Sequence, residues 1–230
     1  MVNGAFTTLP VPLRPLASVL GDRLLRPGKE RRTLAGTLTE GSQTYPCTLI
    51  QELPNKVRID EGGSQPVSLA FDGKVAWLSN GNVTEQDRDM VESLFDDTPE
   101  MLLFSVQHGG ATRLLIHDGR MDEGSSRNYS GPFVTVYQLV APAVSRTDQR
   151  QKHFYFDSKT GLPMVVRYRI ERSDGRIVFI ETSFGNWTIS NGQLTPGIIM
   201  RSEDGKGVFT FQASSANFGP EANDGVFTKK

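Results

Sequence analysis

The stretch Phe154-Tyr155-Phe156-Asp157-Ser158-Lys159-Thr160-Gly161-Leu162-Pro163 decides the fold class of this chain. Phe154 and Phe156 share one face of an extended segment, and the polar run up to Gly161 is typical of a turn. Working outward, short alternating segments recur in both directions, together with dipeptides that favour hairpins because both turn positions need positive φ. The sequence therefore predicts an antiparallel sheet. The dipeptides are Asp72-Gly73, Asn80-Gly81, Asp118-Gly119, Asp174-Gly175, Asn191-Gly192 and Asp204-Gly205.

The strand pattern is interrupted between residues 84 and 108. Thr84, with Asp87 three positions later, is a helix-capping signal, and Thr98-Pro99 is typical of the start of a second helix. That second helix is apolar nearly all round, so it must be covered on every side. A further short helix is expected over residues 16–25, within an N-terminal segment 1–28. The pattern indicates about eleven or twelve strands and a mainly β, α+β fold.

Composition excludes several classes of protein. The chain has 230 residues, and its sequence pattern does not change in character from one end to the other. Both features suit a single β domain over 1–230. The 25 Lys and Arg residues balance 26 Asp and Glu residues, so no basic field exists for nucleic acid. No apolar stretch approaches the ~20 residues of a membrane span. Prolines interrupt residues 1–25, which therefore do not form a signal peptide as they stand.

The sequence holds no recognisable catalytic or metal-binding motif. The three histidines lack metal-ligand spacing, and Cys47 is a single thiol in a strand-like run, best interpreted as a half-buried apolar residue. Nothing pairs a nucleophile with a base. We therefore expect a non-enzymatic protein without metal or cofactor. An acidic group is expected to form a solvated helix face, with a calcium site as the weaker alternative: Asp87, Asp89, Glu92, Asp96 and Asp97.

Several segments, taken in order, resemble the LolA/LolB-like superfamily of outer-membrane lipoprotein carriers. They include Leu53-Pro54 before an alternating strand, and Thr160-Gly161-Leu162-Pro163 in a late hairpin. The classical shuttle carries an arginine where this chain has Leu53, so the resemblance is to a distant member. It covers about residues 30–228, through segments 53–58, 71–77, 99–106, 156–163, 184–199 and 217–227.

The resemblance implies an incomplete β-barrel of about 11 strands, with helices at 84–108 covering or plugging the concave side. It implies an apolar hollow that binds the acyl chains of a lipid or lipoprotein, in a periplasmic carrier or receptor. A membrane-anchored protein is the implied donor or acceptor, and an export signal or anchor would have been removed. We expect a monomer.

Alternation selects the residues of the expected apolar wall, because every second side chain of a strand faces the same side. Ordinary core packing without a hollow is the alternative for each. The strand at 176–184 is apolar on both faces, which predicts burial on both sides. The candidate ligand-binding residues are Val57, Ile59, Leu69, Phe71, Val75, Trp77, Met90, Leu94, Met101, Leu102, Phe104, Phe154, Phe156, Val166, Tyr168, Ile198, Met200, Phe209 and Phe211.

Two other functions stay open at this point. Relatives with this fold act as envelope sensors that bind a partner protein, and such a role predicts an exposed apolar patch outside the hollow. An enzyme would need convergent polar groups at the mouth of the hollow. Lipid that co-purifies with the protein would favour the carrier.

Overall fold

The computed structural model describes residues 30–107, 113–121, 132–142, 149–190, 193–220 and 224–228. Over these residues the chain forms an open antiparallel sheet of twelve strands and a separate two-stranded ribbon. The order across the sheet is β5-β4-β3-β2-β1-β14-β13-β10-β9-β8-β7-β6. The predicted mainly β half-barrel is confirmed. The expected helix at 16–25 and the segment 1–28 lie outside the described residues, and the single domain over 1–230 stays a prediction.

The elements have the following bounds. The strands are β1 (Glu30–Glu40), β2 (Gln43–Glu52), β3 (Lys56–Glu61), β4 (Val67–Phe71), β5 (Ala76–Leu78), β6 (Arg113–Arg120), β7 (Phe133–Pro142), β8 (Gln149–Asp157), β9 (Pro163–Glu171), β10 (Ile177–Gly185), β11 (Thr188–Ser190), β12 (Gln193–Thr195), β13 (Ile198–Glu203) and β14 (Lys206–Pro220). The helices are α2 (Glu85–Val91), the π-helical η3 (Glu92–Asp96), α3 (Pro99–Gln107) and the short 3-10 turn η4 (Asp224–Val226).

The hairpin signals are correct where the next strand follows at once. Asp204 and Gly205 join β13 to β14 with φ values of 48° and 77°, the left-handed conformation that this turn needs. Asp118-Gly119 is different, because both residues lie inside β6 and pair with Thr135 and Val134 of β7. The predicted turn there is wrong: pairing with the neighbouring strand overrides the local preference.

Aliphatic side chains form a continuous row across the inner face of strands β1 to β5. In adjacent strands Leu34 lies opposite Leu49, Leu49 opposite Ile59, Ile59 opposite Leu69, and Leu69 opposite Leu78. Directly opposed apolar pairs of this kind are the unit that stabilises a sheet. We name this row of five residues the aliphatic ladder.

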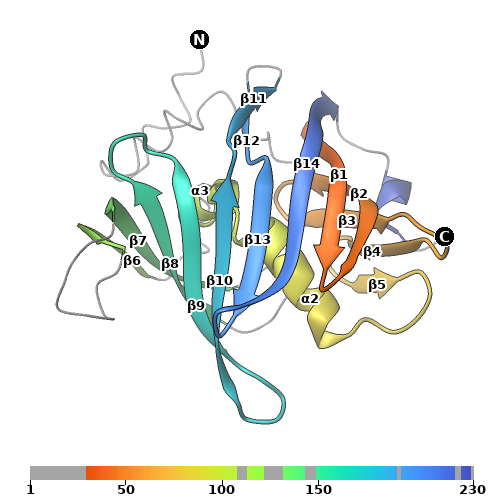
Figure 1. Ribbon diagram of the computed structural model, residues 1–230, viewed down its shortest axis with the longest axis horizontal. Coiled ribbons are helices and arrows are strands. Elements are labelled where there is room, and N and C mark those ends of the chain that lie inside the picture. The colour runs from red at the N-terminus through yellow and green to blue at the C-terminus, as the bar shows by residue number, and fades with distance from the viewer. Residues whose placement is uncertain are drawn as a thin grey trace.

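The segment α2–η3–α3 lies on the concave side of the sheet, behind β10, β13 and β14 in the view of Figure 1. Thr84 caps α2 as expected, since its hydroxyl accepts the backbone N–H of Asp87. Every side chain from 89 to 103 is buried, charged ones included. We name Glu85–Gln107 the helical cover. It fits the expected position of the helices at 84–108.

Strand β10 departs from the expected burial on both faces. Val178 and Ile180 are buried on the inner face, but Ile177 and Phe179 are 69% and 39% exposed on the outer face. The prediction is therefore wrong for the outer face, because nothing in the described part of the chain covers this part of the sheet. Isolated exposed apolar side chains are common on protein surfaces, so alternation alone could not decide this point.

Candidate functional site

Most of the predicted wall residues lie together in one core between the sheet and the helical cover. Phe104 is only partly buried and packs against that core. Whether these residues bind a ligand stays a prediction. The buried members are Val57, Ile59, Leu69, Phe71, Met90, Leu94, Met101, Leu102, Phe154, Phe156, Val166, Tyr168, Phe209 and Phe211.

Four predicted wall residues lie outside this core instead. Val75 lies in the turn before β5, and the other three lie on the outer face of their strands: Trp77, Ile198 and Met200. Val75 and Met200 are 62% and 43% exposed. Trp77 pairs with Ala70, on the face opposite the ladder pair Leu69 and Leu78. Ile198 and Met200 alternate with the inner residue Ile199. On β13 the predicted period of two is correct but its phase is wrong, because the inner face of this strand also carries a charged residue, Arg201.

Trp77 instead holds the C-terminal segment against the outer face of β3 and β5. Its indole N–H donates to the carbonyl of Phe227 over 2.6 Å, and Arg58 donates to the carbonyl of Val226 over 2.8 Å. Phe227 is buried, with the Lys56 ammonium 5.8 Å from the centre of its ring. This part of the outer face is therefore covered by the chain itself.

A second row crosses the inner face of β8, β9, β10 and β13, and it is polar. It consists of Lys152, Tyr168, Thr182 and Arg201, one from each strand, all buried. We name these four residues the polar band. Except for Tyr168, the sequence analysis missed them, because it searched the inner positions for apolar residues. The signal was present in the spacing: Lys152 stands two residues before Phe154, and Arg201 two residues after Ile199.

The polar band binds the acidic and hydroxyl groups of the helical cover. The Asp97 carboxylate accepts hydrogen bonds from Lys152 over 2.5 Å, Thr182 over 2.6 Å and Tyr168 over 3.2 Å. Arg201 donates to the Ser93 hydroxyl over 2.7 Å. These contacts place the π-helical η3 against the band. Single π-helical turns within α-helices occur frequently at functional sites.

The expected solvated acidic face is therefore wrong for most of its members. Asp89, Glu92, Asp96 and Asp97 are all buried. Lys152 lies 3.0 Å from the Glu92 carboxylate, so the cations that neutralise these acids come from the sheet. Buried charges are retained only when they are paired, which explains why acids and cations occur together here.

Burial and charge act against each other at Lys152. Burial alone would lower the pKa of its ammonium, but the neighbouring carboxylates of Asp97 and Glu92 outweigh burial and hold the pKa above its ordinary value. Burial raises the pKa of the Tyr168 phenol, and the same two carboxylates add to the effect. Lys152 is therefore charged and Tyr168 neutral at physiological pH.

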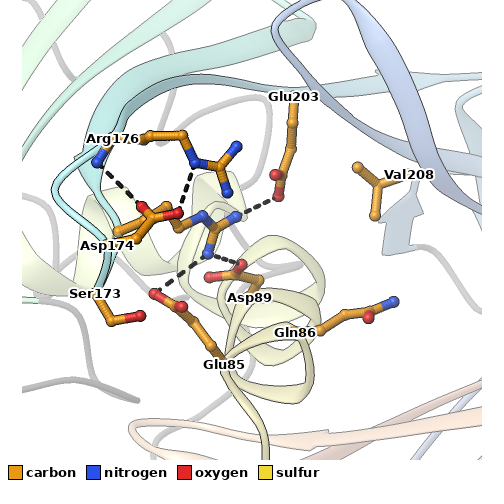
Figure 2. Close-up of a pocket in the computed structure, with 9 residues that line it drawn as sticks. Glu85, Gln86, Asp89, Ser173, Asp174, Arg176, Glu203 and Val208 are labelled. Atoms are coloured by element: carbon orange, nitrogen blue, oxygen red, sulfur yellow. Dashed lines mark hydrogen bonds and ion pairs between the residues drawn. The ribbon is translucent and has the colours of Figure 1, made fainter.

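The polar contacts continue to the rim of the sheet. A pocket of about 390 Å³ lies there, between α2 and the hairpins β9–β10 and β13–β14. Figure 2 shows the carboxylates of Glu85, Asp89 and Glu203 turned toward the same point. The Arg172 guanidinium lies 3.4 Å from Glu85 and 2.6 Å from Glu203 and also contacts Asp89. This pocket is polar and is unlike the predicted apolar wall.

The chain has a single cysteine. Cys47 is buried on the inner face of β2, and burial, with the carboxylates of Glu61 and Asp60, raises the pKa of its thiol to about 12. Among the described residues no group of acids, histidines and cysteines is placed to hold a metal ion. None of the helices in this part of the chain is long and apolar enough to cross a membrane.

Comparison with solved structures shows the same fold. The structure is similar to that of a LolA superfamily protein from Nitrosomonas europaea, with a TM-score of 0.52, 13% identity and coverage of 92% of this chain and 96% of the other. The structure is also similar to that of a domain from Vibrio parahaemolyticus with a proposed role as an outer membrane lipoprotein-sorting protein. The TM-score is 0.48 and the identity 10%, and the match covers 93% of this chain and 94% of the other. No protein-family model and no curated protein matches the sequence. The predicted resemblance to LolA-like proteins is thus confirmed for the fold.

Proposed function

We propose that this protein is a non-enzymatic, periplasmic carrier or receptor that binds the acyl chains of a lipid or lipoprotein. The observation that carries the proposal is the aliphatic ladder, an apolar surface five strands wide that is covered by a separate helical segment. The fold that the chain shares with the LolA superfamily protein supports the same function. A membrane-anchored protein would supply or receive the ligand.

The energetics of such a site are favourable. Each buried methylene contributes about 0.8 kcal/mol, so a long acyl chain gains roughly 10 kcal/mol before association costs are subtracted. Loss of translational and rotational freedom removes a large part of that gain. The remainder suits a carrier, which must release its ligand as well as bind it.

Lipid extraction tests the proposal first. Protein purified without detergent is extracted with organic solvent, and the extract is analysed by mass spectrometry for bound lipid. The stripped protein is then titrated with a fluorescent fatty acid. Binding near one probe per chain is expected, and the absence of both co-purified lipid and probe binding would refute the proposal.

Two matched variants place the binding on the inner face. Leu78→Gln alters the ladder at its partly buried end and should weaken probe binding about tenfold or more. Ile177→Gln changes an exposed apolar residue of the outer face and should leave the affinity unchanged. Equal loss in both variants, or in neither, would argue against the inner face. Circular dichroism checks that both variants are folded.

A second candidate function rests on the outer face of β10. Ile177 and Phe179 are exposed neighbours on that face, as a protein that senses its ligand through a partner would need. If this candidate is correct, Ile177→Gln abolishes partner capture while probe binding is unchanged. In a pure carrier Ile177→Gln affects neither.

A further inference from the structure

The two ends of the sheet differ in chemical character. We call the end where β8 turns into β9, and where the ribbon β11–β12 follows β10, the upper end, as in the view of Figure 1. The lower end holds the hairpins β9–β10 and β13–β14. Antiparallel pairing places these turns and hairpins at opposite ends, because β8, β9, β10 and β13 alternate in direction.

A group of apolar side chains lies at the upper end, and we name it the apolar tip. It consists of Phe133, Leu162, Trp187 and Ile189. Phe133 and Ile189 are 58% and 64% exposed, and Leu162 and Trp187 are partly buried. The tip therefore presents apolar surface to solvent from β7, from the turn between β8 and β9, and from the ribbon.

Hydrogen bonds hold the members of the tip together. The backbone N–H of Ser158, in the β8–β9 turn, donates to the Phe133 carbonyl over 3.2 Å. The Trp187 indole N–H donates to the Pro163 carbonyl over 3.0 Å. After β10 the chain turns through Asn186, whose φ of 51° is one that asparagine adopts more readily than most residues, and leaves the large sheet to form the ribbon. Single exposed apolar residues are common, but a connected group marks a surface that contacts a partner or a membrane.

The lower end has exposed apolar side chains as well, but charged residues lie beside them. Ile177 pairs with Glu171, and Phe179 pairs with Arg169 in the neighbouring strand. The polar pocket at the rim lies at this same end, between α2 and the two hairpins. Contact with an apolar medium would remove these charges from water, which is unfavourable, so the lower end is unsuited to such contact.

Negative charge also accumulates at the lower end. Burial, followed by repulsion from neighbouring carboxylates that include Asp87, raises the pKa of Glu40 and of Glu61. Gln86 of α2 forms a hydrogen bond with Glu40 and also lines the pocket at the rim, so these acids adjoin those of the pocket. An anionic surface therefore repels the lower end and favours approach by the upper end.

Cations accompany the apolar tip. The Arg120 guanidinium lies 4.1 Å from the centre of the Phe133 ring, and Lys159 is exposed in the β8–β9 turn. The Asp157 carboxylate accepts the backbone N–H groups of Lys159 and Thr160, which fixes the conformation of this turn. Aromatic and aliphatic side chains beside Lys and Arg are the composition that binds the interfacial region of a bilayer with anionic lipid.

We infer that the apolar tip docks the protein onto a bilayer that contains anionic lipid. Phe133 and Ile189 enter the headgroup region, and Lys159 contacts lipid phosphate. The acidic lower end then points away from the membrane. Phe133 and Ile189 are exposed, outside the core that would hold an acyl chain, so this docking goes beyond the proposed function and does not depend on it.

Vesicle flotation tests the inference. The whole chain is mixed with vesicles of phosphatidylcholine and phosphatidylglycerol and centrifuged through a sucrose gradient, where it should float with the vesicles. Ile189→Gln should weaken this binding about fivefold or more, because the residue loses its apolar contact with the bilayer. Phe133→Ser repeats the test at the other end of the tip. Ile177→Gln is the matched control, since it changes a residue that is 69% exposed at the lower end, and it should leave binding unchanged. Absence of flotation, or equal loss in Ile189→Gln and Ile177→Gln, overturns the inference.

A lysine variant tests the electrostatic part of the docking. One cation near an anionic membrane surface contributes about 1 kcal/mol, so Lys159→Gln should weaken binding to the mixed vesicles roughly fivefold. Binding to vesicles of phosphatidylcholine alone should not change. Lys206→Gln is the control, because Lys206 is exposed in the hairpin β13–β14 at the lower end. Equal loss in Lys159→Gln and Lys206→Gln would show attraction without orientation and overturn the inference.

Tryptophan fluorescence reports on the tip itself. The chain has two tryptophans, so Trp77→Phe leaves Trp187 as the only one. Addition of the mixed vesicles should shift the emission of Trp187 to shorter wavelength, because its surroundings become less polar. Flotation without any change in this emission would place the membrane contact elsewhere and overturn the inference. Flotation by a protein that binds no fatty acid would refute the proposed function alone.

Discussion

The aliphatic ladder and the polar band occupy the same inner face and lie under the same helices, and both are buried except for Leu78 at one end of the ladder, yet their contacts differ in kind. The aliphatic side chains of the ladder can pack against any apolar neighbour, so the ladder forms a surface without a specific partner. The charged and polar side chains of the band need particular partners, so the band fixes the position of the helical cover. Burial alone therefore does not identify a ligand wall. What distinguishes the two rows is whether their contacts can be exchanged for those of another molecule.

Removing one charge of the polar band should have the largest effect on stability. Lys152→Met leaves the fully buried carboxylates of Asp97 and Glu92 without their shared cation, so the free energy of unfolding should fall by about 3–5 kcal/mol. Urea denaturation measures the change. Arg176→Met is the control, because Arg176 forms an exposed pair with Asp174 and its loss should lie within experimental error. Similar small losses in both variants would contradict a buried network.

Truncating the ladder should cost less and should depend on volume. Leu49→Ala removes a fully buried side chain and should lower the free energy of unfolding by about 2–5 kcal/mol. Leu49→Met keeps the volume and should cost less than about 1.5 kcal/mol. The same denaturation experiment measures both variants. If Leu49→Met lowers the free energy of unfolding as much as Leu49→Ala, the ladder requires one particular side chain at this position. That result would contradict the proposed difference between the ladder and the polar band.

The two rows also explain how far the sequence could predict this structure. Alternation located the strands and the ladder residues Ile59 and Leu69, because their inner positions are apolar and the turns beside them are short. It could not locate Lys152 or Arg201, whose burial depends on carboxylates more than fifty residues away in the chain. The acids of the cover were expected in solvent for the same reason: a charge on a helix gives no sign of a cation on a strand.

The outer-face errors have a different origin. Trp77 and Met200 are apolar residues of alternating strands, and a period of two does not state which phase faces inward. At β5 the phase is set by pairing with β4, and at β13 by pairing with β10 and β14. That Trp77 contacts Phe227, 150 positions later, could not be seen in any local pattern.

Replacing Trp77, which lies on the outer face, should have a moderate effect on stability. Trp77→Phe removes the hydrogen bond to the Phe227 carbonyl and should lower the free energy of unfolding by about 1 kcal/mol. Because Trp77 faces away from the ladder, its replacement should not change the affinity for the fluorescent fatty acid. Weaker fatty-acid binding by this variant would place Trp77 on the ligand side and contradict the register of β5.

The smallest expected effect concerns pH. Burial, followed by repulsion from Glu40 and Asp87, raises the pKa of Glu61. For an acid whose pKa is raised on folding, the charged form destabilises the fold, and this penalty disappears as the pH falls below the ordinary value. Glu61→Gln should therefore stabilise the protein slightly at pH 7, and the gain should shrink toward zero by about pH 4. Exposed Glu171→Gln is the control. If the stabilisation by Glu61→Gln instead grew as the pH falls, it would contradict a pKa of Glu61 that is raised on folding.

Intermolecular NMR contacts test the central claim most directly. Stripped protein with labelled methyl groups is mixed with a ¹³C-labelled fatty acid, and nuclear Overhauser effects between acyl methylenes and protein methyls are recorded. The account predicts effects to Ile59 and Leu69 of the aliphatic ladder and none to Val166 and Ile180 beside the polar band. Effects to Val166 and Ile180 without effects to the ladder would contradict it.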